Sequence, residues 1–447
     1  MKKLLWMAAV AMLAAACTSE SGPSTISYDE LKAVEIVNAQ VPVTFASVLG
    51  RDAVTRGAIT NKSTLAAENG FGVFAYYTQG NYSNSAKPNF MYNQQVSSTD
   101  NGATWTYAPI KYWPNQTQRD GENTPYDISA TKDKLSFFAY APYVDINADG
   151  TITDPQTNQP KAYGITSITP ANNGTGDVRI RYEATKSHAE DLMWGVAQND
   201  TQWTGVDGSN TTISAGTPFK DLVKPATSTN ITFYFKHALT RLGLTVQAAN
   251  NTTIAGGNEL WGNDAGNKTK ILIEKITIDR PIHTGGTLIL NNTTAGEPYW
   301  DPQSLNAHAA TEFVIDQADG DLDPDLAYIP GATAANQPEG VLTTKEKSVL
   351  GTTNNAPDYF YLIPETTSPA NTNITIVYHV ITDDAKLDGG MSDIKNTITK
   401  SIGQLTLEQA KDYNIHIIIG MTSVNIDVSV ENWTDLGDTH ANLPINS

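Results

Sequence analysis

The residue with the clearest potential for covalent chemistry is Cys17, the only cysteine of the chain. It follows Lys2, Lys3 and an apolar run over residues 4–16 that ends in three alanines. A positive start, an apolar stretch too short to span a bilayer and small residues before a cut are typical of a secretory signal. A thiol directly after the cut can carry a thioether-linked diacylglycerol, with a third chain on the new amino terminus. We therefore expect 1–16 to be a lipoprotein signal peptide and Cys17 to be lipidated; the alternative is a small buried cysteine.

Two arginines could be substrates for a protease of the trypsin type. Arg56 precedes Gly57 among small residues, and Arg51 lies shortly before them. Both follow an extended segment whose apolar side chains fall mostly on one side: Val41, Val43, Phe45 and Leu49. That period of two predicts a half-buried strand, and the arginines then lie in the loop after it. The competing interpretation is that both arginines are ordinary surface residues.

The remaining chemistry-bearing residues do not form a catalytic pattern. The sequence has no His-Glu-x-x-His, no Gly-x-Ser-x-Gly and no glycine-rich phosphate loop after a strand. The seven histidines are scattered, and His237 and His416 lie in strand-like runs. Paired acids are plentiful in so acidic a chain, so they do not indicate glycoside hydrolysis. We expect a protein that is not an enzyme and has no cofactor.

Two acidic stretches invite comparison with calcium loops. Asp145, Asn147, Asp149 and Gly150 have the spacing of the first half of an EF-hand loop, but Gln156 stands where a bidentate glutamate is needed. A second stretch contains Asp316, Asp319, Asp321, Asp323 and Asp325. The preferred interpretation is a hairpin loop for the first stretch and a solvated loop for the second. No metal site is predicted.

Composition restricts the class of partner. The chain has 447 residues, 40% hydrophobic and 17% charged, with a net charge of −18. Loss of residues 1–16 removes Lys2 and Lys3 and leaves −20. Such a surface repels nucleic acid and anionic headgroups, so no nucleic-acid partner is expected. A single cysteine allows no internal disulfide, and no apolar run beyond the leader reaches the ~20 residues of a membrane span.

Short apolar stretches punctuated by Gly, Pro, Asn and Asp dominate the chain after the leader. We expect strands within 71–77, 135–140, 165–168, 178–182, 192–196, 231–235, 241–246, 271–278, 287–290, 313–315, 359–363, 374–381, 413–419 and 424–430. In the last of these, Val424, Ile426, Val428 and Val430 alternate with polar residues. Modest helical periodicity occurs only over 391–402 and 406–412. The polar stretch 204–229 is a candidate domain boundary, and the pattern predicts an all-β fold of sandwiches.

The sequence resembles the fimbrillins, the pilin lipoproteins of type V pili of Gram-negative anaerobes. The matching motifs are Ala-Ala-Cys at Cys17, Thr-Arg-Gly at 55–57, Phe-Gly-Val-Phe-Ala-Tyr at 71–76, Lys-Tyr-Trp-Pro at 111–114, Leu-Ser-Phe-Phe-Ala-Tyr-Ala-Pro at 135–142, Phe-Lys-His-Ala-Leu-Thr-Arg-Leu at 235–242, Tyr-Asn-Ile-His-Ile at 413–417 and Glu-Asn-Trp at 431–433. Their order and their spread over nearly the whole chain carry the resemblance.

The resemblance implies two tandem transthyretin-like β-sandwich domains, at 57–225 and 226–447, after a propeptide at 17–56. It implies a lipidated precursor at the outer membrane that an extracellular protease cuts after an arginine, here Arg56 or Arg51. The removed piece carries a plug strand, here Val41 to Leu49. A strand from another pilin subunit then fills its groove, and the donor falls within Val424 to Ser447.

Several alternatives stay open. The chain could be a polymerising stalk or tip subunit, or an anchor subunit that keeps its lipid. The adhesion ligand could be a host protein or a glycan. The runner-up is a lipid-anchored, non-polymerising surface protein that binds glycan. The aromatic residues that could stack on sugar rings in such a protein are Trp105, Tyr112, Trp113, Trp203 and Trp300.

Overall fold

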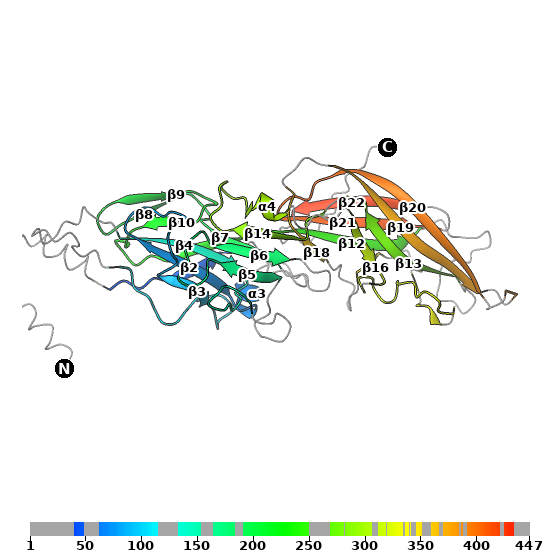
Figure 1. Cartoon of the computed structure of the whole chain (residues 1–447), viewed down its shortest axis with the longest axis horizontal. Coiled ribbons are helices and arrows are strands. Elements are labelled where there is room, and N and C mark those ends of the chain that lie inside the picture. Colours follow the sequence, from blue (N-terminus) through cyan, green and yellow to red (C-terminus); the bar gives the residue numbers. More distant parts are fainter. Residues whose placement is uncertain are drawn as a thin grey trace, which may run out of the picture.

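The computed structural model describes residues 40–48, 62–114, 133–152, 164–183, 191–249, 269–280, 282–305, 312–318, 320–333, 336–338, 340, 346–350, 359–365, 370–383, 386–387, 391–420 and 424–432. The chain forms an elongated molecule in which two all-β bodies lie end to end (Figure 1). α-Helix is confined, within these residues, to the short segments α3 (Lys62–Ala67) and α4 (Pro302–Leu305). The predicted all-β sandwich fold is confirmed.

The amino-terminal body is built on a seven-stranded sheet with the order β1-β11-β7-β4-β2-β3, in which β10 also pairs with β4. A second sheet has the order β15-β14-β6-β5, and β8 and β9 form a separate hairpin. The strands are β1 (Phe45–Val48), β2 (Phe71–Thr78), β3 (Met91–Val96), β4 (Lys134–Ala141), β5 (Ile165–Thr169), β6 (Arg179–Glu183), β7 (Met193–Val196), β8 (Thr201–Thr204), β9 (Asn210–Ile213), β10 (Phe219–Leu222), β11 (Ile231–His237), β14 (Gly285–Ile289) and β15 (Tyr299–Trp300).

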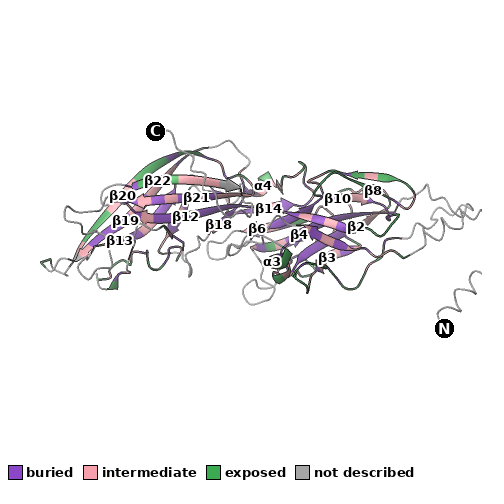
Figure 2. Ribbon diagram, turned by 180° about the vertical axis from the view of Figure 1, so that it is seen from behind, coloured by how far each residue is buried: buried purple, intermediate pink, exposed green. Residues whose placement is uncertain are grey.

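The seven-stranded sheet is buried on both faces. Phe74 and Phe138 point into a core shared with the second sheet, which includes Ile180 and Leu288. Phe71 and Phe137 point the other way, into a core covered by α3 and by the segment around Trp105. Because both faces are covered, β2 and β4 read as continuous apolar runs rather than as alternating ones. Figure 2 shows the buried residues concentrated along these central strands.

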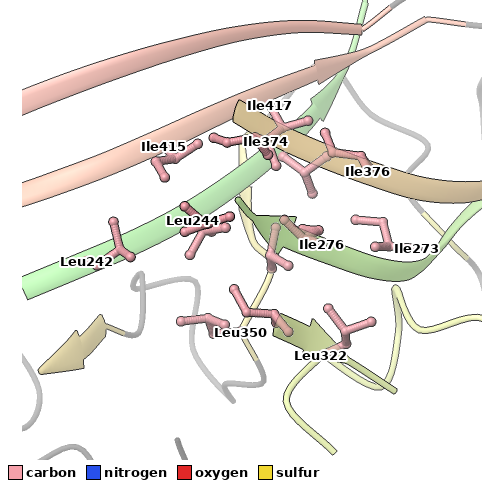
Figure 3. Close-up of a cluster of buried hydrophobic side chains, with 14 of the residues drawn as sticks. Leu242, Leu244, Ile273, Ile276, Leu322, Leu350, Ile374, Ile376, Ile415 and Ile417 are labelled. Atoms are coloured by element: carbon pink, nitrogen blue, oxygen red, sulfur yellow. The ribbon is translucent and has the colours of Figure 1, made fainter. Parts of the chain in front are cut away.

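The carboxy-terminal body is a second sandwich. One sheet has the order β17-β12-β21-β22, with β18 also paired to β12, and the other has the order β16-β13-β19-β20. Their strands are β12 (Thr240–Ala248), β13 (Thr269–Ile278), β16 (Phe313–Asp316), β17 (Lys347–Ser348), β18 (Tyr359–Leu362), β19 (Ala370–Asp383), β20 (Met391–Leu405), β21 (Lys411–Ile419) and β22 (Val424–Asn432). Figure 3 shows the aliphatic core between the sheets, where Leu244, Ile276 and Ile415 meet.

Sheet membership does not change at the expected boundary between 225 and 226. After that point β11 still pairs with β7, and β14 pairs with β6 in the amino-terminal body. The polar stretch 204–229 contains β9 and β10, so it belongs to this body and is not a linker. Its polarity reflects exposure of the β8–β9 hairpin, whose strands are mostly solvent-facing.

Two helical expectations were wrong. Residues 391–402 lie in β20, which pairs with β19 along its whole length. Ile394, Ile398 and Ile402 are four residues apart, a spacing that puts side chains on one face of a helix and equally on one face of a strand. Residues 406–410 form an irregular connection, and β21 begins at Lys411. No helix in the part of the chain that the structure describes is long and apolar enough to cross a membrane.

Candidate functional site: an amino-terminal strand in a sheet groove

The segment 41–48 lies at the edge of the seven-stranded sheet. Its second half, β1, pairs in parallel with β11, with Phe45 opposite Ile231 and Val48 opposite Tyr234. Every other ladder of this sheet is antiparallel. Beyond β11 the next strand is β7, so β1 covers a strand that would otherwise be the edge of the sheet.

The first half of the segment pairs with a different part of the chain. The amide of Val43 donates to the carbonyl of Lys111 over 2.9 Å, and the amide of Trp113 donates to the carbonyl of Val41 over 2.9 Å. At Thr44 the pairing changes side, because the amide of Ile231 donates to the carbonyl of Thr44 over 2.9 Å. The segment therefore lies in a groove with two rims, residues 111–113 and β11.

Inward-facing side chains of the segment complete the core of the amino-terminal body. Val43 is fully buried and Phe45 is 4% exposed. The ring of Phe45 lies among three aromatic rings, with centroid distances of 5.4 Å to Tyr107, 5.9 Å to Phe137 and 6.0 Å to Phe233. Aromatic pairs at these separations add to the free energy of burial, so this pocket is the strongest side-chain attachment of the segment.

Tyr107 connects the segment to the first rim. Its hydroxyl donates to the carbonyl of Val43 over 2.8 Å and accepts a hydrogen bond of 3.2 Å from the amide of Lys111. Burial raises the pKa of the Tyr107 hydroxyl, so the group stays a neutral donor at physiological pH. Sequence analysis did not single out Tyr107 for this role, and only its place shortly before the Lys-Tyr-Trp-Pro motif pointed to the region.

The remaining site residues predicted from the sequence include the lipidation site and the processing site. Leu49, Arg51, Arg56, Gly57 and Cys17 lie outside the described residues. The arginines belong to the stretch of sequence between β1 and α3, so they follow the buried segment directly along the chain. Val41, Val43 and Phe45 are brought together in one groove, with Val41 partly buried against the same core.

The donor-strand candidates lie in β22, in the other body. β22 pairs antiparallel with β21 over its whole length, from Val424 opposite Ile419 to Asn432 opposite Lys411. Val424 is buried, and Ile426, Val428 and Val430 are partly buried against the carboxy-terminal core. One edge of β22 has no strand partner within the described residues. The groove and β22 belong to different bodies of the molecule (Figure 1).

Carboxylates in both acidic loops form hydrogen bonds or ion pairs with other groups of the protein. Asp149 accepts hydrogen bonds from the amide and hydroxyl of Thr151, as in a tight hairpin loop. Lys347 lies 3.4 Å from Asp323 and 3.2 Å from Asp325. His237 pairs with Asp191, and His416 with Glu346. No cluster of three or more His, Cys, Asp or Glu side chains that could hold a metal ion occurs among the described residues.

Most aromatic residues considered for glycan stacking are core residues. Trp105, Trp113, Trp203 and Trp300 are each at most 8% exposed, whereas Tyr112 is 45% exposed. Trp113 and Trp203 pack on each other, with ring centroids 5.4 Å apart. Of this set, only Tyr112 presents a ring to solvent.

Comparison with known proteins shows that the chain is similar to fimbrial proteins. No family model matches the chain. The chain is 24% identical over 413 residues to fimbrium subunit Fim1C of Phocaeicola vulgatus, with 87% of this chain and 88% of that protein covered. A solved fimbrial protein from Bacteroides vulgatus matches with a TM-score of 0.52 and 19% identity, over 88% of this chain and 100% of that one. The resemblance to fimbrial subunits indicated by the sequence motifs is therefore confirmed, and the chain has the fold of a fimbrial protein.

Proposed function

We propose that the chain is a structural subunit, stalk or tip, of a type V cell-surface pilus that serves adhesion. Its precursor is lipidated at Cys17, attached to the outer membrane and cut after Arg56 or Arg51. The segment 41–48 then leaves its groove, and a strand from another pilin subunit takes its place. The observation that carries the proposal is the position of this segment, which is buried in a core yet precedes the candidate cleavage residues in sequence.

Loss of the segment would leave unpaired backbone groups and empty apolar pockets in the groove. β11 would become an edge strand, and the carbonyl of Lys111 and the amide of Trp113 would lose their hydrogen bonds to the segment. An edge strand with unpaired backbone groups is a template for pairing with another chain. The pockets of Val43 and Phe45 would accept alternate apolar side chains of that strand, at about 1.5–3 kcal/mol for each fully buried one.

The donor is a segment of another subunit that falls within Val424 to Ser447. β22 can contribute by opening its ladder with β21, and its four alternating apolar residues match the need for an inward-facing row. The sequence after Asn432 is the other candidate, and it offers Trp433, Leu436 and Leu443 as apolar residues. Because groove and donor lie in different bodies, the contact between subunits is head-to-tail, and head-to-tail contacts that do not close generate a fibre.

The relatives support the same role. The curated relative is named as a fimbrium subunit, and the solved structure is described as a fimbrial protein. On this proposal the partners of the chain are other pilin subunits, with a host protein or glycan as the adhesion ligand. The site of action is the cell surface, and the chain carries out no enzymatic reaction.

The test is controlled activation of the purified precursor. Trypsin treatment should release the residues up to Arg51 or Arg56 and produce oligomer ladders that survive mild denaturant, together with fibres in electron micrographs. Precursor incubated without trypsin is the control and should stay monomeric. A processed chain that stays monomeric and binds glycan would instead support the runner-up, a non-polymerising lipid-anchored glycan-binding protein.

A further inference from the structure

Ser47 is an unfavourable residue at its place in the groove. It follows Val43 and Phe45 on the same face of the extended segment and is 1% exposed. Its hydroxyl oxygen is buried and makes no hydrogen bond to any described residue. A buried hydroxyl without a partner loses its hydration and gains nothing in return. An alanine would fill the same place without that loss.

The parallel direction of the β1 ladder also weakens the attachment of the segment to the sheet. β1 runs parallel to β11, although β11 pairs antiparallel with β7 on its other side. Parallel ladders have slanted hydrogen bonds and are slightly less stable per residue than antiparallel ladders. An incoming strand of the opposite direction would therefore form a better ladder with β11 than the resident segment does.

Tyr107, in contrast to Ser47, stabilises the segment in its groove. Its hydroxyl joins the carbonyl of Val43 to the amide of Lys111, and its ring packs on Phe45. Without this hydroxyl, both main-chain groups would be left without this hydrogen bond in a buried site. The contact to Val43 is made to the main chain, so it does not depend on which side chain the strand carries at that position.

From these observations we infer that Ser47 and Tyr107 together set how long residues 41–48 stay in the groove. Tyr107 is the positioning residue that retains the segment. Ser47 destabilises the bound segment and so shortens the time that the segment spends in the groove. This inference rests on the proposed exchange function, since a strand that never leaves needs no such balance. It also assigns the ligand of the groove: an extended peptide that is apolar at the positions of Val43 and Phe45 and favours a small apolar residue at that of Ser47.

Hydrogen exchange of the intact, uncleaved chain measures this balance directly. The readout is the exchange rate of the amides in a peptide that covers residues 41–48. Ser47→Ala should slow that exchange by about tenfold, and Tyr107→Phe should speed it by about tenfold or more. The amides of β21 and β22, in the other body, should exchange as in the unmodified chain.

Two matched variants serve as controls. Tyr76→Phe removes a hydroxyl that also donates to a main-chain carbonyl, that of Gly176, but does not touch the segment. It should leave exchange at 41–48 unchanged. Ser136→Ala removes a buried hydroxyl whose oxygen accepts from the amide of Asp221, so it should lower the melting temperature. The contrast separates a partnered serine from the unpartnered Ser47.

The outcomes distinguish this inference from the proposed function. Unchanged or faster exchange in Ser47→Ala, or unchanged exchange in Tyr107→Phe, would overturn the inference. If the exchange rates follow the expected order but cleaved chains never assemble, the balance of Ser47 and Tyr107 stands and the pilus function fails. If cleaved chains assemble, Ser47→Ala should do so about tenfold more slowly, because departure of the segment precedes exchange.

Discussion

The ring of Phe45 stacks on that of Phe233 across the parallel ladder, with centroids 6.0 Å apart and planes 20° from parallel. This contact joins the segment before the candidate cleavage residues to the strand that it covers. Phe233 is fully buried and also packs against Phe71, Phe219 and Phe235. The side chains that attach the segment 41–48 are therefore part of the core of the amino-terminal body.

Phe45→Ala should release the segment without unfolding the body. Truncation of a buried phenylalanine typically costs about 3–5 kcal/mol, and here the loss falls on the short segment at the edge of the sheet. β11 keeps its ladder with β7, so we expect exposure of residues 41–48 and faster exchange of the β11 amides. Limited proteolysis and hydrogen exchange check this. Ile394→Ala, at a 56% exposed position, is the control and should change neither.

Acid should destabilise the carboxy-terminal body through Glu274. Burial disfavours its ionised form, but hydrogen bonds from Lys395 and His379 outweigh burial and lower its pKa. A glutamate whose pKa is lowered on folding contributes stability above its unfolded pKa of about 4.3 and loses it as the pH falls through the folded value. Urea unfolding at pH 7 and below pH 4 should show this loss, and Glu274→Gln should reduce it. An identical pH dependence in both proteins would contradict the assignment.

The buried pair of Arg280 and Glu365 offers a test of the carboxy-terminal core. Arg280 contacts Glu365 and donates to the carbonyl of Leu405, and both side chains are almost fully buried. Arg280→Met leaves a buried carboxylate without its cation and should lower the free energy of unfolding by about 3–5 kcal/mol. The double variant Arg280→Met, Glu365→Leu should lose much less. A double variant that loses as much as Arg280→Met would contradict the claim that the unpaired carboxylate of Glu365 causes the loss.

Cys17→Ala tests attachment to the membrane. Each buried methylene contributes about 0.8 kcal/mol, so two or three acyl chains hold a protein firmly where none would. The variant should leave the membrane fraction and fail to incorporate labelled fatty acid. Cells that express the unmodified chain are the control. Labelled lipid on the alanine variant would place the modification elsewhere.

Sequence alone predicted those strands whose burial leaves a clear pattern. β22 has one face on the core, and Val424, Ile426 and Val428 therefore alternate with polar residues. β2 and β4 are covered on both faces and appear as unbroken apolar runs. The period of two at Val41, Val43 and Phe45 likewise predicted a strand, and β1 includes Phe45. In each case local side-chain periodicity follows directly from burial.

Local sequence patterns did not predict which strands pair with one another. Phe45 pairs with Ile231, far along the chain, and the direction of that pairing is parallel. The hydroxyl of Tyr107 reaches Val43 from a segment that contains no regular strand. The sharing of β11 and β14 with the amino-terminal body follows from sheet order, which depends on contacts between distant residues. Residue type gave no sign of the buried, unpartnered hydroxyl of Ser47.

The most direct measurement of the central claim is polymer formation by cells that express the double variant Arg51→Ala, Arg56→Ala. If loss of the amino-terminal segment opens the groove, this variant should accumulate as a lipidated monomer. It should give no ladder in mild denaturant and no fibre in electron micrographs. The two single variants show which arginine is cut. Normal polymers from the double variant would contradict activation by cleavage at either arginine.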